Sequence, residues 1–548
     1  MAFSVLAGVG LPVLAGCDLP GASKAKDSAS ANGSASAKGK AKAGSTDWQK
    51  LDAHIMGHNV TVEVSPVIRK NDTTSIMALE LTRAKDDASI DRVKTDSSDT
   101  EDNKLNISSY LGTPSIYRPG TGASLVKLLD LGSGRVWSAT DGSGADDGFL
   151  EITPGEKTTS YLSFGKVDTD TVTVMVPMAG FTTVSVLEAD AAKKASIDLD
   201  AASSNLDQFP DAATELAKPA TIERYTRALD DSTSTHTGDK DVTVTLASDV
   251  TFASDSADLT PAADTQLQTV ADQLDQYPDG GTLTVVGHTD DVQDDAYNQT
   301  LSEKRANAVK TKLQQLTDLD KWNPTTTGKG ESEPRVKDTT DEARAANRRV
   351  EITLTPTGGT TPKDSNTSAT PSNGSDSGKL PAPQGPVAKG SKGVTLTSKG
   401  TDTSGEVTIT LDHLTRQDGY LLGTITCTVK DGSTGAPLHP LLEDPQTLLA
   451  NQRDEDGSAL PTFNASDGLT LIASGERIFP ADYLDADAEH HLPLTELNIS
   501  DHLKTGTTTI CTIWPDPGGD TITLDHPDGK YAVKDTAYRL TDIPIKNS

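Results

Sequence analysis

The sequence predicts a multidomain α+β protein, in which a central α/β sandwich is flanked by two antiparallel β-sandwich domains of the immunoglobulin-like type. Its 548 residues exceed the size at which one hydrophobic core stops growing. Residues 47–190 and 394–548 contain short runs of alternating apolar and polar side chains, which predict strands with one buried face. Residues 241–356 alternate strand and helix patterns, which is typical of helices packed on a sheet.

The composition excludes one class of partner. The formal net charge is −31, from 80 acidic and 49 basic residues, and no Lys/Arg-rich stretch stands out beyond one short linker that contains lysines. Because a polyanion would be repelled, we expect no nucleic-acid partner. Hydrophobic residues make up only 34% of the chain and aromatic residues 4%, which predicts folded modules separated by disordered stretches.

The first 16 residues carry no charged side chain. They are too few for a membrane-spanning helix, which needs about 20 apolar residues, but they match the apolar part of a signal peptide. Leu14-Ala15-Gly16-Cys17 resembles the bacterial lipobox, whose cysteine is acylated, for example with palmitate, and becomes the new N-terminus. A buried strand or helix is the alternative, but the Gly/Ala/Ser/Lys tract that follows cannot bury a core. We therefore expect a signal peptide over 1–17 with lipidation at Cys17, and a flexible tether over 18–46.

The first predicted domain covers residues 47–190. Val60, Val62 and Val64 alternate with polar residues, and residues 172–176 repeat this pattern before a proline. Such runs, punctuated by Gly, Asn, Asp and Pro, predict an antiparallel β-sandwich. Residues 191–240 are rich in Ala and Asp, with a weak helical pattern near 221–229, and are interpreted as a connector.

The last predicted domain follows a linker over residues 357–393, whose Thr/Pro/Ser/Gly/Lys composition is too polar to fold alone. Residues 394–548 return to β patterning and form the second β-sandwich. Cys427 and Cys511 both lie in candidate strands, so a disulfide between them is one expectation for an exported protein. Two free buried thiols are the alternative.

The central module, residues 241–356, has the clearest pattern. We predict strands at 242–246 and 282–286 and a final strand entered at 347–352. One helix starts at Pro261 with Thr260 as its N-cap, and its apolar face repeats at the spacing i, i+3, i+4, i+7. A second helix covers about 301–316. This order predicts helices that cover one face of a sheet.

Several spaced motifs in this module resemble the OmpA-like C-terminal domain, over about a fifth of the chain. They are Gly287-His288-Thr289-Asp290, Asn298, Leu301-Ser302, Arg305-Ala306 and Asn347-Arg348-Arg349-Val350-Glu351-Ile352. The resemblance implies non-covalent binding of the peptide stem of peptidoglycan, without catalytic residues or a cofactor. It assigns the ammonium of the stem's diamino acid to Asp290, its carboxylate to Arg305, and a peptide hydrogen bond to Asn298. Further site positions are Thr289, Asp255 and Leu301.

The chemistry of the ligand supports this pair independently. The side chain of diaminopimelate ends in a zwitterion, so its recognition requires an anion beside a planar, two-pronged donor, as Asp and Arg provide. An ordinary surface pair, worth about 0–1 kcal/mol, is the alternative. Gln293 stands where the family usually has glycine, in the acidic loop 290–295. The sequence therefore leaves open whether the stem carries diaminopimelate, lysine or ornithine.

Other groups of potentially metal-binding or catalytic residues do not predict a site. His54 and His58 precede a strand without a third ligand, and His490-His491, after Asp485, Asp487 and Glu489, is interpreted as a polar loop, so we predict no metal site. The sequence has no Gly-x-Ser-x-Gly elbow, and no nucleophile accompanies His288 and Asp290. We therefore predict that the protein is not an enzyme.

The sequence thus predicts a lipid-anchored protein of the cell envelope, such as an outer membrane, facing the cell wall or periplasm. It would bind peptidoglycan and link the membrane to the wall. In the alternative, the β-sandwich domains bind an envelope protein partner as a receptor or assembly surface, and the wall-binding module only positions them.

Overall fold

The structure is a computed structural model that describes residues 43–87, 104–112, 122–140, 150–202, 216, 218–360, 380–430, 433–444, 465–485, 490–499, 502–528 and 535–548. The predicted signal peptide, Cys17, most of the tether and residues 361–379 of the linker over 357–393 lie outside these residues. In the described part the chain is mostly β-strand with few helices. That part contains no helix with the length and apolar character needed to cross a membrane.

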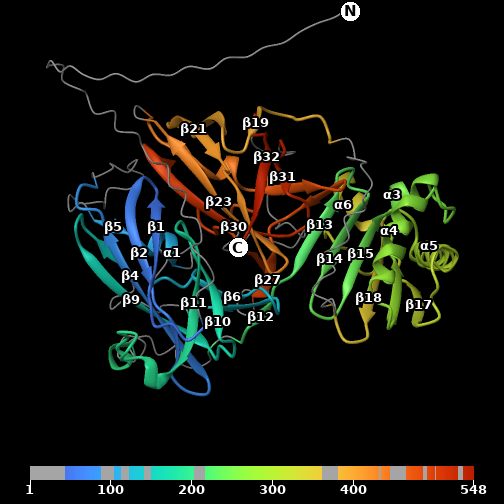
Figure 1. The fold of residues 1–548 in the computed structure, drawn as a ribbon. Coiled ribbons are helices and arrows are strands. Elements are labelled where there is room, and N and C mark those ends of the chain that lie inside the picture. Colours follow the sequence, from blue (N-terminus) through green and yellow to red (C-terminus); the bar gives the residue numbers. More distant parts are fainter. Residues whose placement is uncertain are drawn as a thin grey trace, which may run out of the picture. The chain divides into compact units, whose positions relative to one another are not determined.

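The N-terminal β segment forms one ten-stranded sheet in the order β1-β2-β4-β3-β11-β10-β6-β7-β12, with β9 paired to β4. Figure 1 shows its first strands in blue. The prediction at Val60, Val62 and Val64 is confirmed, since all three are buried in β2. The strands and short helices of this segment are β1 (Gln49–Ile55), β2 (His58–Val64), β3 (Val67–Arg69), β4 (Thr74–Arg83), β5 (Leu105–Asn106), α1 (Ser108–Leu111), β6 (Lys127–Asp130), β7 (Arg135–Ser138), β8 (Glu151–Ile152), β9 (Lys157–Gly165), β10 (Thr171–Val176), β11 (Gly180–Glu188), η1 (Ala189–Ala191) and β12 (Ala220–Thr221).

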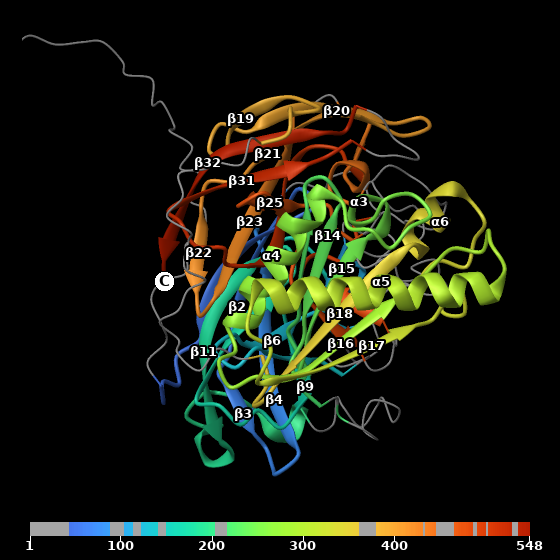
Figure 2. The ribbon, with the colours of Figure 1, turned by 90° about the vertical axis from the view of Figure 1, so that its right-hand side faces the viewer.

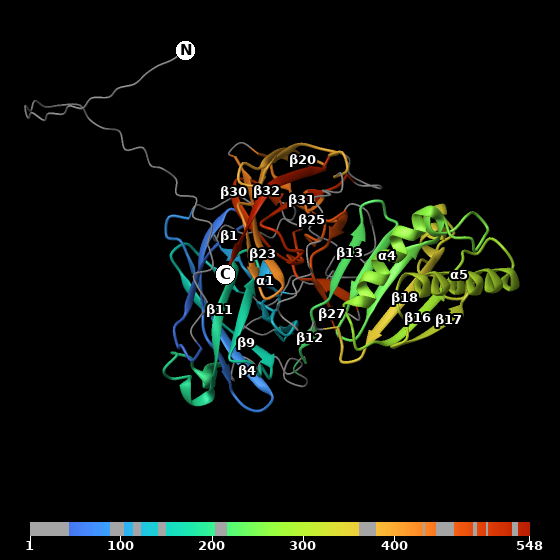
Figure 3. The same cartoon turned by 45° about the vertical axis from the view of Figure 1, so that its right-hand side comes forward.

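The central module is a sheet covered by two long helices on one face (Figures 2 and 3). Its strand order is β17-β16-β18-β15-β14-β13, and only the β16–β17 pair is parallel. Helix α5 packs on β16 and β17, beside α4. The elements are β13 (Arg224–Ala228), β14 (Thr233–Thr237), β15 (Val242–Ala247), α3 (Ser248–Thr251), α4 (Pro261–Asp275), β16 (Gly281–Gly287), α5 (Asp295–Leu316), β17 (Trp322–Gly328), α6 (Asp341–Asn347) and β18 (Arg349–Pro356).

The predicted start of helix α4 is confirmed. Thr260 has an extended backbone, and its hydroxyl accepts a hydrogen bond from the amide of Ala263 at 3.3 Å. The four predicted apolar positions of α4 are all buried, namely Leu267, Val270, Ala271 and Leu274. Helix α5 begins earlier than predicted, because Asp294 caps it by accepting from Tyr297 N at 2.9 Å.

The predicted connector contains regular structure. Residues 224–228 form strand β13 and not a helix, and β13 pairs with β14 on one side and with β26 on the other. These pairings decide the conformation, since a weak helical pattern stabilises little by itself.

The C-terminal β segment has the order β26-β25-β31-β32-β22-β23-β21-β20, with β19 on β32 and β30 on β23. Most pairs are antiparallel, but β19 and β22 each pair with β32 in parallel. The elements are β19 (Val387–Lys389), β20 (Val394–Lys399), β21 (Ser404–Thr410), β22 (Leu414–Gln417), β23 (Tyr420–Val429), β24 (Ala436–Pro437), η3 (His439–Leu441), β25 (Thr470–Ala473), β26 (Glu476–Ile478), β27 (Asp482–Asp485), β28 (His490–Pro493), β29 (His502–Leu503), β30 (Gly506–Pro515), β31 (Thr521–His526) and β32 (Tyr538–Asn547).

The two β segments share buried surface, although some 200 residues separate them in the chain. One continuous cluster of buried apolar side chains contains Val62 and Val174 of the first segment and Ile409 and Trp514 of the second. The amide of Gly57 donates to the carbonyl of Thr507 at 2.9 Å. Local sequence pattern predicted each segment as strands, but it carried no signal for this contact.

The predicted disulfide is wrong, because Cys427 and Cys511 are both free and buried. They lie on the neighbouring antiparallel strands β23 and β30, but Cys427 faces Thr508, three residues before Cys511. Since facing residues share a side of the sheet and odd offsets change side, the two thiols point to opposite faces. They contribute to different buried clusters.

We expect a reducing agent to leave the melting temperature of the protein unchanged. Burial raises the pKa of Cys427 to about 12 and raises that of Cys511 as well, so both stay protonated and unreactive in the folded state. Thermal unfolding with and without dithiothreitol measures the effect. A bridge between the two residues in a peptide map of the native protein would contradict the structure.

Candidate functional site

Two glycines allow helix α5 to approach the end of the sheet. Gly287 ends β16 and faces Gly328, which ends β17, in the parallel pair. A Cβ atom on Gly287 would collide with the backbone carbonyl of Ser302 in α5, and one on Gly328 would collide with the Ser302 side chain. The hydroxyl oxygen of Ser302 accepts a hydrogen bond from Gly330 N at 3.0 Å. This contact places the first half of α5 beside the loop that follows Gly287.

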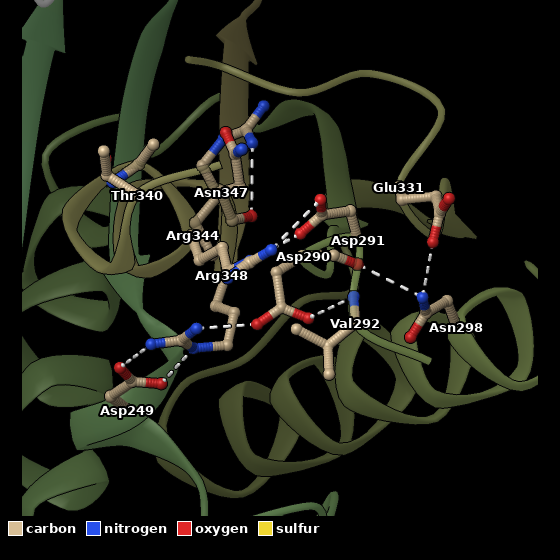
Figure 4. A network of polar contacts seen from close by, with 12 residues as sticks. Asp249, Asp290, Asp291, Val292, Asn298, Glu331, Thr340, Arg344, Asn347 and Arg348 are labelled. Atoms are coloured by element: carbon tan, nitrogen blue, oxygen red, sulfur yellow. Dashed lines mark hydrogen bonds and ion pairs between the residues drawn. The ribbon is translucent and has the colours of Figure 1, made fainter. Parts of the chain in front are cut away.

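Asn298 of α5 fixes the shape of that loop (Figure 4). Its Nδ2 donates to the carbonyls of Asp290 and Gln293, both at 3.1 Å, and lies 2.6 Å from Glu331 Oε2. The Asn298 side chain is buried. The Nδ2 group of Asn298 therefore already donates to acceptors of the protein itself. Asn298 thus positions the loop that carries Asp290.

Asp290 forms an ion pair with Arg348, at the end of α6 (Figure 4). The Nη1 atom of Arg348 lies 2.6 Å from Asp290 Oδ2, while its Nε and Nη2 bind both carboxylate oxygens of Asp249 at 2.7 and 2.6 Å. Both carboxylates raise the pKa of Arg348, and the hydrogen bonds with Asp249 have the largest effect. The other oxygen of Asp290, Oδ1, accepts only a long bond of 3.4 Å from Val292 N among the described residues. It therefore keeps capacity for another donor.

Arg305 lies on α5, and although the residue is largely buried, its guanidinium is incompletely bonded. Its residue is 5% exposed, its Nε donates to the Ser256 carbonyl at 2.9 Å, and the guanidinium lies 5.1 Å from the ring centroid of Phe252. Within the described part of the chain, its two Nη atoms have no hydrogen-bond partner. Burial lowers the pKa of Arg305, while nearby carboxylates oppose this effect, namely those of Asp249, Asp255 and Asp290.

The remaining predicted positions surround this pair. Asp255 has a left-handed backbone, with φ of 53°, and its Oδ1 accepts from the Tyr297 hydroxyl at 2.8 Å. Thr289 is buried, and its amide donates to Gly330 O at 2.9 Å. Leu301 is half-buried on α5. The structure thus brings the predicted residues to one end of the sheet. There Asp290 forms its ion pair with Arg348, and its charge affects Arg305 only by electrostatic attraction without a hydrogen bond.

Sequence reasoning assigned no role to Arg348 or Asp249. A signal was available, because Arg348 and Arg349 are adjacent at the start of a strand and neighbouring strand residues point to opposite faces. Arg349 is buried and its Nε donates to Glu351 Oε1 at 2.7 Å, so Arg348 is the arginine that faces the loop. On the other side of the loop, Arg344 Nε donates to Asp291 at 2.7 Å.

Sequence comparisons with known proteins agree with this motif set. The model of the OmpA family matches residues 251–348. Outer membrane porin F of Pseudomonas aeruginosa is 44% identical over 103 residues, which cover 19% of this chain and 29% of the porin. YfiB of Escherichia coli K12 is 36% identical over 111 residues, which cover 20% of this chain and 68% of YfiB.

The solved structure of the cell wall anchor of the T6SS from Pseudomonas aeruginosa is 32% identical, covering 22% of this chain and 83% of that one, with a TM-score of 0.19. The family-model match over residues 251–348 defines this module as one of the OmpA-like class. The chain belongs to the OmpA family through this module. It spans less than a third of the length of porin F.

Proposed function

We propose that the OmpA-like module binds the peptide stem of peptidoglycan without catalysing a reaction, and that the chain, lipid-anchored at Cys17, links a membrane to the cell wall. The observation that carries this proposal is the buried Arg305, whose Nη atoms have no partner among the described residues. A largely buried cation with unused donors that remain reachable is well placed to bind an anion. A carboxylate fits, since the guanidinium fork can bind both of its oxygens.

Asp290 supplies the complementary charge. Arg348 holds its Oδ2 atom in place, and Oδ1 remains available for an ammonium group. Asp249 and Asp255 add negative charge near the same position. A ligand end that carries an ammonium and a carboxylate on one carbon would bind Asp290 and Arg305 together. This requirement favours diaminopimelate over lysine or ornithine, because only diaminopimelate brings a distal carboxylate to Arg305.

Binding of a soluble muropeptide with a diaminopimelate stem tests the proposal. We expect Asp290→Asn and Arg305→Lys each to weaken binding by about 10- to 100-fold, since a charge-assisted hydrogen bond contributes about 1.5–3 kcal/mol. Titration calorimetry on the full chain measures the dissociation constants. Asp264→Asn is the matched control, because Asp264 forms an ordinary surface ion pair with Lys312 at 2.7 Å in the same module.

A second ligand separates the two roles. A muropeptide with a lysine stem lacks the distal carboxylate, so Arg305→Lys should change its affinity little while Asp290→Asn still weakens it. Equal binding of the diaminopimelate ligand by wild type and both variants would refute the site. Release of muropeptides from intact peptidoglycan on prolonged incubation would refute the non-catalytic role.

A further inference from the structure

Two histidines and a glutamate gather at a place that the wall-binding site does not use. Glu223 directly precedes β13, His236 lies in β14 and His491 lies in β28. The earlier interpretation of His490-His491 as a polar loop is therefore wrong, since both belong to a strand paired with β27. Glu223 forms an antiparallel bridge with Asp482 of β27, which connects β13 to that hairpin.

The strand registers place all three side chains on one face. His236 faces Tyr225, and Glu223 lies two residues before Tyr225, so these side chains share a side. Asp482 faces Glu223, Leu484 lies two residues further along β27, and His491 faces Leu484. The regular alternation of the strands thus presents the three side chains together.

The donor atoms meet closely. Glu223 Oε2 lies 2.6 Å from His236 Nε2 and 2.9 Å from His491 Nε2. One ligand atom of each residue lies within 4.8 Å of the other two. The side chains of Glu223, His236 and His491 are 15, 27 and 14% exposed, so they are shielded but reachable from solvent.

We propose that Glu223, His236 and His491 form a binding site for a divalent transition-metal ion of the zinc class. Two imidazoles and one carboxylate are a recurring ligand set for zinc, with a water molecule completing the tetrahedron. Calcium and magnesium prefer oxygen ligands, so the imidazoles select against them. At metal–ligand distances of about 2.0–2.1 Å, tetrahedral donors lie about 3.3 Å apart, so Glu223 Oε2 needs to move away from His236 Nε2 by about 0.7 Å and from His491 Nε2 by about 0.4 Å.

The ion would connect distant parts of the sequence. His491 lies in the C-terminal β segment, whereas Glu223 directly precedes β13 and His236 lies in β14, the two strands that extend the sheet of the OmpA-like module. A bound metal would therefore stabilise the contact between these two parts of the chain. The site is independent of Asp290 and Arg305, so its test does not depend on wall binding.

Zinc binding by the full chain, after removal of metals with a chelator, tests the proposal. Titration with Zn²⁺ should give one ion per chain, and zinc should raise the melting temperature. His236→Gln and His491→Gln should each weaken binding by at least about 100-fold, since loss of an outer-shell partner alone costs 10- to 100-fold. His490→Gln is the matched control, because His490 is the neighbour of His491 and points to the opposite face of the strand.

X-ray absorption of the zinc-loaded wild-type chain gives a result that does not depend on the folding of any variant. We expect two imidazoles with only nitrogen and oxygen ligands at about 2.0–2.1 Å. Failure of the wild type to bind zinc, a sulfur ligand, or unchanged binding by both His236→Gln and His491→Gln would overturn the proposal. In that case Glu223 is only a hydrogen-bonded bridge between two histidines.

Discussion

The substitution Gly287→Ala should destabilise the OmpA-like module by about 3 kcal/mol and abolish muropeptide binding, since overpacking costs about 1–3 kcal/mol and this contact is with rigid backbone. The new Cβ atom would meet the backbone carbonyl of Ser302, which cannot rotate away as a flexible side chain could. Helix α5 would have to move from the end of β16. Because α5 carries Asn298 and Arg305, this movement would displace Arg305. It would also break the hydrogen bond from Asn298 that holds the loop of Asp290.

Urea unfolding and muropeptide titration of Gly287→Ala measure both effects. Gly132→Ala is the control, because the nearest atom to a Cβ there is Asp130 Oδ1 at 3.7 Å. It should change the free energy of unfolding by no more than about 0.5 kcal/mol. An unchanged unfolding midpoint for Gly287→Ala would show that α5 does not need this close approach.

The sequence pattern predicted the parts of the central module that local chemistry determines. Thr260 and Pro261 located the start of α4, and alternating apolar residues located β15 and β16. Strand β17 was missed because Asn323-Pro324-Thr325 has no apolar alternation. Such a segment forms a strand only as the partner of β16 at the edge of the sheet, where a proline is tolerated.

The site was predictable in its residues but not in their pairings. The motif positions of Asp290 and Arg305 follow from sequence, whereas the ion pair between Asp290 and Arg348 depends on how α6 returns to the sheet. The zinc-class site was even less predictable from sequence, because strand pairings between distant segments bring His491 to Glu223 and His236. The spacing of these three residues along the chain does not predict that they lie together.

Glu496 should make the stability of the whole β region depend on pH near neutrality. Its side chain is buried, and its Oε1 accepts hydrogen bonds from Met178 N at 2.8 Å and Cys511 N at 3.0 Å, which joins the two β segments. Burial raises the pKa of Glu496 from 4.5 to about 7. The folded state therefore binds a proton that the unfolded state releases, so the contribution of Glu496 to stability is full below pH 4.5 and is lost as the pH rises through 7.

Glu496→Gln, which keeps an acceptor oxygen without the charge, should remove this loss. We expect the variant to match wild type near pH 4.5 and to be more stable at pH 8 by about 3 kcal/mol, the free energy of the pKa shift. Urea midpoints of both proteins from pH 4.5 to 8 measure the difference. The exposed Glu406→Gln is the control and should show none. A constant difference across this range would mean that Glu496 keeps one protonation state in the folded protein, and that its contact with Met178 and Cys511 does not respond to pH.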